Sequence, residues 1–301
     1  MNVLEVQGLT KRYGETTAVE DLSLTVQQGQ VFGFLGPNGS GKTTTLGMIF
    51  GVISPTRGTV SLFGESVREA LARGRVCGTL EQPNFYPYMT GRENLRVVAT
   101  IKGLRKELVT PALEAVDLGE SACREVKGYS LGMKQRLALA AAMLGDPEFL
   151  ILDEPTNGLD PEGMREIREL IVQLSRTGRT ILISSHLLDE VEKICTHVAI
   201  LNRGRLQRSG AVAQFTCSGV TFRLRAEDAR QLFEAVTQYE CVRNVRAAAD
   251  AVYAELTDDR PAHLSRYLAG RGIYLKELSN QRQSLEEVFL AATESEATAK
   301  M

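Results

Sequence analysis

A glycine-rich octapeptide, GPNGSGKT at residues 36–43, constrains the fold of this chain more than any other feature. It follows an apolar run at residues 31–35, which is short and bounded by Gly29 and Gly36, as is typical of a buried strand. Residues 43–50 then have the length and apolar content of a helix start. In a strand, glycine-rich turn and helix of this order, backbone N–H groups turn inward and the helix N-terminus adds partial positive charge. The sequence therefore predicts a phosphate-binding loop in an α/β fold.

The side chains of the octapeptide suit that prediction. Gly36, Gly39 and Gly41 let the backbone approach phosphate oxygens, because glycine tolerates the required backbone angles. Lys42 is placed to reach the terminal phosphates of a nucleotide, and the Thr43 hydroxyl to bind the magnesium that accompanies a triphosphate. The alternative is a glycine-rich turn with a solvated lysine, which a full match in this context disfavours.

Length and composition limit the class of protein. A chain of 301 residues exceeds the size at which one core usually keeps growing, so we expect two domains. Lys plus Arg number 35 against 37 Asp plus Glu, which is not the charge balance of a dedicated nucleic-acid binder, and we expect no nucleic acid partner. The 5 cysteines form no C-x-x-C pair, as in a reducing compartment. Without a signal sequence or a long apolar segment, we expect a cytoplasmic protein that does not itself span a membrane.

Strand patterns precede the octapeptide. Residues 3–6 and 22–26 alternate apolar and polar side chains and, with residues 16–18, predict an antiparallel strand group. Tyr13 is expected in the first connection of this group. Its ring can stack on an adenine, although a lone tyrosine in a loop is more often a packing residue.

Further strands are predicted at residues 59–63 and 76–80, and Gln82 follows the second of them. The pattern then becomes helical over residues 85–145, where apolar side chains recur at helical spacing. We interpret this segment as a mostly helical insertion.

The insertion begins with two local signals. Thr90 and Glu93 have the spacing of a capping box, in which each side chain satisfies a backbone N–H at the helix start. Phe85, Tyr86 and Tyr88 lie close together and form either a partner-docking surface or the apolar side of the insertion, and the sequence does not decide between them.

An apolar strand predicted at residues 149–153 ends in Asp153 and Glu154. Strands buried on both faces belong to parallel sheets, so these carboxylates emerge at the C-terminal strand end, where ligands of open α/β sheets bind. Asp153 can hold magnesium directly or through water, and Glu154 is the better candidate to orient and deprotonate an attacking water. A buried strand that ends in Asp-Glu is by itself only a moderately specific sign of a functional site. The phosphate loop elsewhere in the same chain makes that interpretation stronger.

Three signals follow that strand. Asp160 and Pro161 predict the cap and first residue of a helix. A buried strand at residues 180–185 ends in His186, which can bond a terminal phosphate or a water, although a lone histidine is more often structural. Residues 198–206 predict a closing hairpin.

Residues 129–136, YSLGMKQR, run into an alanine-rich helix before the strand that ends in Asp153 and Glu154. This segment resembles the LSGGQ signature of ABC transporter ATPases, and the resemblance extends in order over about residues 1–210. It implies an α/β P-loop NTPase of ABC type, with a mixed sheet core, an antiparallel β subdomain and a helical subdomain at about residues 85–145. The octapeptide looks like the Walker A motif, residues 149–154 like Walker B and residues 157–160 like the D-loop.

The resemblance also implies roles for single residues. The implied catalytic residues are Glu154, the switch histidine His186, and Lys42. The implied Mg²⁺ ligands are Thr43, the Q-loop glutamine Gln82, and Asp153. The residues implied to bind ATP are Tyr13, Gly36, Asn38, Gly39, Ser40, Gly41, Lys42, Thr43, Thr44, Gln82, Ser130, Gly132 and Asp160.

The signature departs from the family form at Tyr129, Leu131 and Met133. Ser130 keeps its hydroxyl and Gly132 its unhindered backbone N–H, both where the following helix would aim its N-terminus at an anion. The departures therefore concern the tightness of the turn and the turnover rate more than the mode of action. Similar leucine-for-glycine forms occur in exporter ATPases of the bacitracin-resistance and multidrug type.

In this family two ATPase domains pair head to tail, so that the signature of one subunit completes the phosphate site of the other. The resemblance therefore implies a homodimer that closes over two Mg-ATP and drives a separately encoded transmembrane permease, peripheral on the inner face of the cell membrane. The signature form favours export of a drug, peptide or lipid.

Two alternatives remain at this point. A soluble ABC-type mechanochemical ATPase acting on ribosomes or nucleic acid is disfavoured by the single ATPase unit, the near-neutral charge and the lack of long heptad insertions. A nucleotide-binding regulator without turnover is disfavoured by Glu154 and His186.

Residues 217–293 predict a C-terminal accessory domain. The predicted order is a strand at 221–225, a helix at 229–237, strands at 242–247 and 251–256, a helix at 262–269 and a strand at 273–278. This β-α-β-β-α-β order is that of a ferredoxin-like α+β domain. A short apolar helix at 285–292 suits docking, and residues 294–301 are expected to be disordered. Because this part of the sequence carries no phosphate loop or paired catalytic carboxylates, we expect a regulatory or dimer-supporting module.

Overall fold

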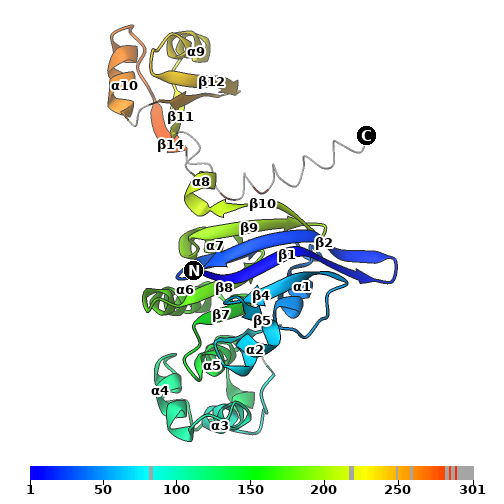
Figure 1. Ribbon diagram of the computed structural model, residues 1–301. Coiled ribbons are helices and arrows are strands. Elements are labelled where there is room, and N and C mark those ends of the chain that lie inside the picture. Colours follow the sequence, from blue (N-terminus) through cyan, green and yellow to red (C-terminus); the bar gives the residue numbers. More distant parts are fainter. Residues whose placement is uncertain are drawn as a thin grey trace. The chain divides into compact units, whose positions relative to one another are not determined.

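The computed structural model describes residues 1–80, 84–216, 220–248, 250–257, 260–281, 285 and 289 (Figure 1). These residues fall into two compact units, the first within Met1–Ala211 and the second within Val212–Ala291. Gln82, most of the helix predicted at 285–292 and the terminal segment 294–301 lie outside the described residues. Within the described ranges, no helix combines the length and the apolar character needed to cross a membrane.

The first unit begins with an antiparallel sheet of strand order β2-β1-β4-β5. Its strands are β1 (Asn2–Tyr13), β2 (Thr16–Gln27), β4 (Arg57–Leu62) and β5 (Glu65–Ser66). The predicted antiparallel group is thus present, but the predicted bounds were too short, and Tyr13 is the last residue of β1 rather than part of a connection. The β1–β2 pairing has register shifts, and Gly8 has a φ of 56°. These irregularities break the strict alternation on which strand prediction relies.

The second sheet of this unit is six-stranded and mixed, in the order β10-β9-β3-β8-β7-β6. Its strands are β3 (Val31–Leu35), β6 (Val76–Thr79), β7 (Phe149–Asp153), β8 (Thr180–Ser185), β9 (His197–Asn202) and β10 (Arg205–Ala211). All its pairings are parallel except that of β10 with β9. The predicted mixed core sheet is confirmed. Since β3, β7 and β8 run in parallel, their C-terminal ends lie at one edge of the sheet.

The closing hairpin of this sheet follows the prediction. Arg203 and Gly204, between β9 and β10, have φ values of 47° and 78°. Two successive positive values are the requirement of a type I′ hairpin turn.

One apolar core joins the two sheets. It contains Leu4 and Leu62 from the antiparallel sheet, Phe34 and Phe149 from the mixed sheet, and Met48 from α1 (Lys42–Ile49), each at most 1% exposed. Burying each such side chain contributes about 1.5–3 kcal/mol. Helix α1 is therefore anchored, and with it the loop that enters its N-terminus.

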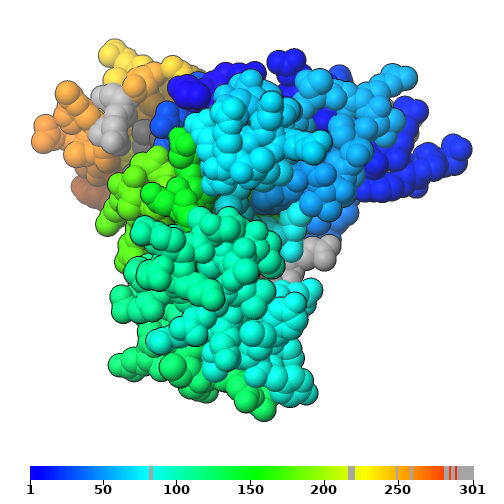
Figure 2. Space-filling model, turned by 60° about the horizontal axis from the view of Figure 1, so that its bottom comes forward, coloured from blue at the N-terminus to red at the C-terminus, as the bar shows by residue number. Residues whose placement is uncertain are grey.

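The other helices of the first unit are α2 (Val67–Ala72), α3 (Gly91–Ile101), α4 (Val109–Glu114), α5 (Leu131–Met143), α6 (Pro161–Arg176) and α7 (Leu188–Ile194). Short 3₁₀ turns at Lys106–Leu108 and Val126–Gly128 connect them. The segments coloured turquoise to sea-green, which include α3 and α4, form a lobe that projects from the rest of this unit (Figure 2).

Local signals predicted two helix starts correctly. Thr90 and Glu93 form the capping box at α3, and Asp160 caps α6 with Pro161 in its first turn. Ahead of α3, Tyr86 and Tyr88 are 60% and 78% exposed. They therefore lie on the surface of the lobe and do not form its apolar interior.

The second unit begins with α8 (Val212–Thr216) and contains a sheet of order β12-β13-β11-β14, with every pairing antiparallel. Its elements are β11 (Val220–Arg225), α9 (Ala229–Thr237), β12 (Val242–Ala248), β13 (Ala251–Leu256), α10 (Pro261–Ala269) and β14 (Glu277–Gln281). Leu224 of β11, Leu232 of α9 and Leu264 of α10 share one core. The two helices thus pack against one face of the sheet.

The last strand of this unit is present, but its predicted bounds of 273–278 were wrong, because β14 spans Glu277–Gln281. Ile273 belongs instead to the end of α10, where its N–H donates to Leu268 O at 3.0 Å and the Gly272 N–H to Ala269 O at 3.0 Å. Gly272 has a φ of 76°, so the arrangement is a Schellman motif with buried Ile273 as its apolar contact. An apolar residue that closes a helix was mistaken for the start of a strand.

Candidate functional site

The predicted phosphate-binding loop, residues 36–43, connects β3 to α1. Two of its glycines have no space for a side chain. A Cβ on Gly41, whose φ is 100°, would lie 2.6 Å from Ala18 O, and a Cβ on Gly36 would meet Ser40 Oγ and Leu201 O. Gly39 has a φ of 79° with open space beside it. These glycines keep the backbone of the loop free to face a ligand.

Ser40 adds a second sign of a ligand site. It is 2% exposed, and its Oγ has no hydrogen-bond partner in the described part of the chain. A buried hydroxyl without a partner is costly, and a phosphate oxygen would satisfy it. Asn38 and Thr43 are exposed and Thr44 half-buried. The loop as built therefore suits the phosphates of a nucleotide.

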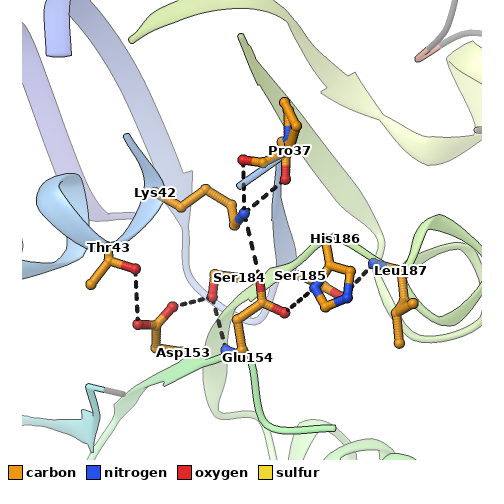
Figure 3. A network of polar contacts seen from close by, with 10 residues as sticks. Pro37, Lys42, Thr43, Asp153, Glu154, Ser184, Ser185, His186 and Leu187 are labelled. Carbon is orange, nitrogen blue, oxygen red and sulfur yellow. Dashed lines mark hydrogen bonds and ion pairs between the residues drawn. The ribbon is translucent and has the colours of Figure 1, made fainter. Parts of the chain in front are cut away.

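Lys42, at the start of α1, extends back along the loop (Figure 3). Its Nζ donates to Gly36 O at 2.7 Å and Pro37 O at 3.3 Å, and lies 3.4 Å from Glu154 Oε1. The side chain is 6% exposed. Its ammonium is therefore held at the site by oxygen atoms on two sides.

The carboxylates at the end of β7 lie opposite the loop, as the prediction requires. Thr43 Oγ1 donates to Asp153 Oδ2 at 3.3 Å, and Asp153 is 5% exposed. Thr43 and Asp153 together offer the oxygen ligands that Mg²⁺ prefers. Gln82, the other predicted metal ligand, lies outside the described residues.

Glu154 has an unusual backbone conformation, with a φ of 48°. Its N–H donates to Ser184 Oγ at 2.9 Å, and its carboxylate lies between Lys42 and His186, whose Nδ1 is 2.8 Å from Glu154 Oε2. The left-handed conformation costs free energy at a residue other than glycine, and residues that adopt it are often found at functional sites. Here it turns the Glu154 side chain toward the loop while Asp153 stays within the strand.

Ser184 is the residue that sequence reasoning missed. It is fully buried, its Oγ donates to Asp153 Oδ1, and it accepts the Glu154 N–H, so one hydroxyl contacts both acidic residues (Figure 3). It is paired in register with Asp153 across the parallel strands β7 and β8. A serine in an otherwise apolar buried strand was the available signal, but the register of the strands was needed to interpret it.

The signature residues make no hydrogen bond to the loop among the described residues. Ser130 caps α5 by accepting the Met133 N–H at 3.2 Å and is exposed, and the nearest atoms to a Cβ on Gly132 would be 3.9 Å away. Tyr129 is buried, and its hydroxyl donates to Ser121 O at 2.7 Å. Desolvation raises the pKa of Tyr129, so the residue is a neutral packing group beside an exposed serine.

Leu131, the leucine at the family glycine position, contacts the segment before α6. A Cβ on Gly158, whose φ is 76°, would lie 3.1 Å from Leu131 Cδ2. The leucine therefore packs against the D-loop of its own chain.

Tyr13 and Asp160 are likewise not joined to the loop by a hydrogen bond or ion pair among the described residues. Tyr13 is 50% exposed, with Lys11 Nζ 5.0 Å from the centroid of its ring. Asp160 Oδ1 accepts the Gly163 N–H at 3.2 Å as the cap of α6. The structure thus brings together Gly36, Lys42, Thr43, Asp153, Glu154 and His186, whereas no hydrogen bond or ion pair among the described residues joins Tyr13, Ser130, Gly132 or Asp160 to that group.

Comparisons with known proteins show which family this chain is similar to. The ABC transporter family model matches residues 19–157. An uncharacterized ABC transporter ATP-binding protein of Bacillus subtilis (strain 168), YhcH, is 37% identical over 296 residues, which cover 97% of this chain and 96% of that protein. The bacitracin transport ATP-binding protein BcrA of Enterococcus faecalis is 46% identical over 208 residues, 68% of each chain.

A solved structure of an ATP-binding subunit of an ABC transporter has a TM-score of 0.64 and 30% identity, covering 71% of this chain and 91% of that chain. The relatives are transport ATP-binding proteins, which supports the transport subunit and not the soluble mechanochemical ATPase. The chain therefore belongs to the ABC transporter family, as one of its ATP-binding and ATP-hydrolysing proteins.

Proposed function

We propose that the first unit hydrolyses Mg-ATP as half of a head-to-tail homodimer that drives a separately encoded permease, with Glu154 as the general base. The observation that carries this proposal is the convergence of Lys42 and His186 on the Glu154 carboxylate, at 3.4 and 2.8 Å, beside a glycine-lined loop. A carboxylate that is held beside a phosphate-binding loop is suited to take a proton from a water molecule at the terminal phosphate.

The residues divide the work of phosphoryl transfer. The backbone N–H groups of the loop and Lys42 would bind the phosphates, and His186 would hydrogen-bond the terminal phosphate or the attacking water. Thr43 and Asp153, with Gln82, would hold the magnesium, whose charge neutralises the phosphate oxygens. Ser184 would keep both acidic side chains in position. Transfer of this kind depends mainly on positioning and charge neutralisation, which this set supplies.

The surroundings of the signature residues support the dimer. Ser130 is exposed at the N-terminus of α5, Gly132 is uncrowded, and no described hydrogen bond connects either residue to the loop of the same chain. A second copy in head-to-tail orientation would bring these donors onto the phosphates. Tyr13 would then stack on the adenine, and Asp160 would lie near the nucleotide at the interface.

A role in transport is supported by relatives such as BcrA, a bacitracin transport ATP-binding protein. We propose that this chain serves an exporter of a drug, peptide or lipid, bound to its permease at the inner face of the cell membrane. The choice of substrate would lie with the permease. Residues 217–293 would form a ferredoxin-like accessory domain that regulates or supports the dimer.

ATP hydrolysis at increasing protein concentration tests the proposal. A site completed by a second copy should give a specific activity that rises with concentration until the dimer predominates. Strictly constant specific activity across the dimerisation range would contradict the shared site.

A mixing experiment sharpens this test. Ser130→Arg, which blocks the signature, and Lys42→Ala, which removes the loop ammonium, should each be inactive alone. Mixed together they should regain part of the activity, because one of the two mixed sites then has an intact loop and an intact signature. Failure of the mixture to regain any activity, with dimers present, would argue against head-to-tail pairing.

A further inference from the structure

An ion pair outside the catalytic network joins α6 to α7. Arg168 Nη1 on α6 donates to both carboxylate oxygens of Glu190 on α7, at 2.9 and 2.8 Å. The two side chains are 23% and 13% exposed, so the pair is largely shielded from solvent. Shielded pairs are screened less than surface pairs and hold their geometry better.

The next residue of α7 is fixed as well. Val191 is 2% exposed and packs onto Gly33 of β3, where a Cβ would lie 2.5 Å from Val191 Cγ1. The helix therefore approaches β3 as closely as a glycine permits, and β3 leads directly into the phosphate loop. Two consecutive residues, Glu190 and Val191, thus attach α7 to α6 on one side and to β3 on the other.

The N-terminal end of α7 has weaker local support. Leu187 stands at the N-cap position, where no side chain caps the helix, and the Leu187 N–H donates to Ser185 Oγ at 3.0 Å. His186 immediately precedes that residue. The 2.8 Å contact between His186 and Glu154 therefore depends on where α7 lies.

We propose that the Arg168–Glu190 ion pair positions His186 against the Glu154 site and so sets the turnover rate of the enzyme. Arg168 and Glu190 are positioning residues, because the hydrogen bonds and ion pairs described for their side chains join α6 to α7 and not to the loop. Because α6 begins after its cap Asp160, the same pair also joins the helix that follows the D-loop to the helix that follows His186. The inference rests on the role given to His186 in the proposed function.

The test replaces each partner by a residue of similar size without charge. Glu190→Gln and Arg168→Met should lower kcat about 10- to 100-fold, the range expected when a functional group is displaced by a fraction of an ångström to an ångström. The affinity for a fluorescent ATP analogue should stay unchanged, because the loop and Lys42 are intact. The exchanged pair, Arg168→Glu with Glu190→Arg, should regain most of the lost turnover.

Two exposed basic residues provide matched controls. Lys193 also contacts Glu190, at 3.1 Å, but is 55% exposed, and Arg165 on α6 is 58% exposed and forms ion pairs with Glu162 and Glu169. Lys193→Met and Arg165→Met should keep wild-type turnover, since exposed pairs contribute little. Arg168→Lys, which keeps the charge, should be intermediate and serves as the test variant if Arg168→Met does not fold.

A substitution of His186 distinguishes an effect on the position of this histidine from a general loss of protein stability. In a His186→Ala background, Glu190→Gln should cause no further loss of kcat, because its effect passes through the histidine. An equal loss in both backgrounds, or a lowered melting temperature with normal kcat, overturns the inference. A large loss in His186→Ala with normal turnover in Glu190→Gln overturns it too, and leaves the proposed function standing. Normal turnover in His186→Ala would remove the histidine from the proposed function and this inference with it.

Discussion

The hydroxyl of Ser184 donates a hydrogen bond to Asp153 Oδ1 across two parallel strands and accepts the backbone N–H of the following residue, Glu154. Both acidic residues are thus oriented by one buried side chain. The contact exists because Ser184 and Asp153 are register partners at the ends of β8 and β7. It makes the serine a residue on which the geometry of the site depends.

Ser184→Ala should therefore lower kcat about 10- to 100-fold, because Asp153 and Glu154 lose a shared anchor. The unfolding free energy should fall by about 1–3 kcal/mol, since buried polar groups lose a partner. Steady-state ATPase kinetics and urea unfolding measure the two effects. Ser175→Ala on α6, whose hydroxyl contacts only Val172 O among the described residues, is the control and should behave as wild type.

Glu154→Gln should nearly abolish turnover, with a loss on the order of 10²–10³ or more, because the amide cannot accept the proton of the attacking water. Nucleotide binding should persist, since the loop and Lys42 remain. Single-turnover hydrolysis and binding of a fluorescent nucleotide separate the two. Glu148→Gln, which removes the ion pair with Arg75 at 2.6 Å, is the matched control. Substantial multiple turnover in purified Glu154→Gln would exclude Glu154 as the general base.

Leu131→Gly, which places the family glycine at this one position of the signature, should destabilise the first unit by about 1–2 kcal/mol. Glycine is unfavourable in a helix, and the contact of the leucine with Gly158 is lost. Leu131→Ala isolates the contact from the backbone effect and should show the smaller loss. Urea unfolding followed by circular dichroism provides the comparison, and equal stability of all three proteins would argue that the leucine packs against nothing in solution.

Cys195 should resist thiol reagents in the folded protein. Burial raises its pKa from 9.0 to about 12, so almost no thiolate forms near neutral pH. The exposed Cys123 should react first, and Cys195 only after unfolding. Alkylation with iodoacetamide followed by peptide mass spectrometry distinguishes the two thiols.

The same shift predicts a pH dependence of stability. Above pH 9.0 the unfolded chain loses the Cys195 proton while the folded chain keeps it until about pH 12. The folded state then binds more protons, so the unfolding free energy falls as the pH rises through this window. Cys195→Ala should remove this part of the decline, and an unchanged alkaline profile in that variant would show that the thiol does not contribute.

Much of the first unit was predictable because its signals are local. The Thr90 and Glu93 capping box, the Asp160 cap before Pro161, and the loop at residues 36–43 each depend on side chains within a few residues of the backbone they organise. Local rules failed in the β1–β2 hairpin, where register shifts interrupt the alternation of buried and exposed residues. They also failed at Ile273, an apolar residue that ends α10 instead of starting a strand.

The sequence by itself determined the phosphate-binding loop, the two acidic residues at the end of β7, and His186 after β8. Each belongs to a short contiguous pattern with a known chemical role, and the order of these patterns indicated the family. Tertiary structure alone decided that Lys42, Glu154 and His186 converge, that Ser184 anchors both acidic residues, and that Arg168 meets Glu190. These contacts join residues far apart in the chain. They depend on strand register and on the packing of one helix against another, which no short stretch of sequence encodes.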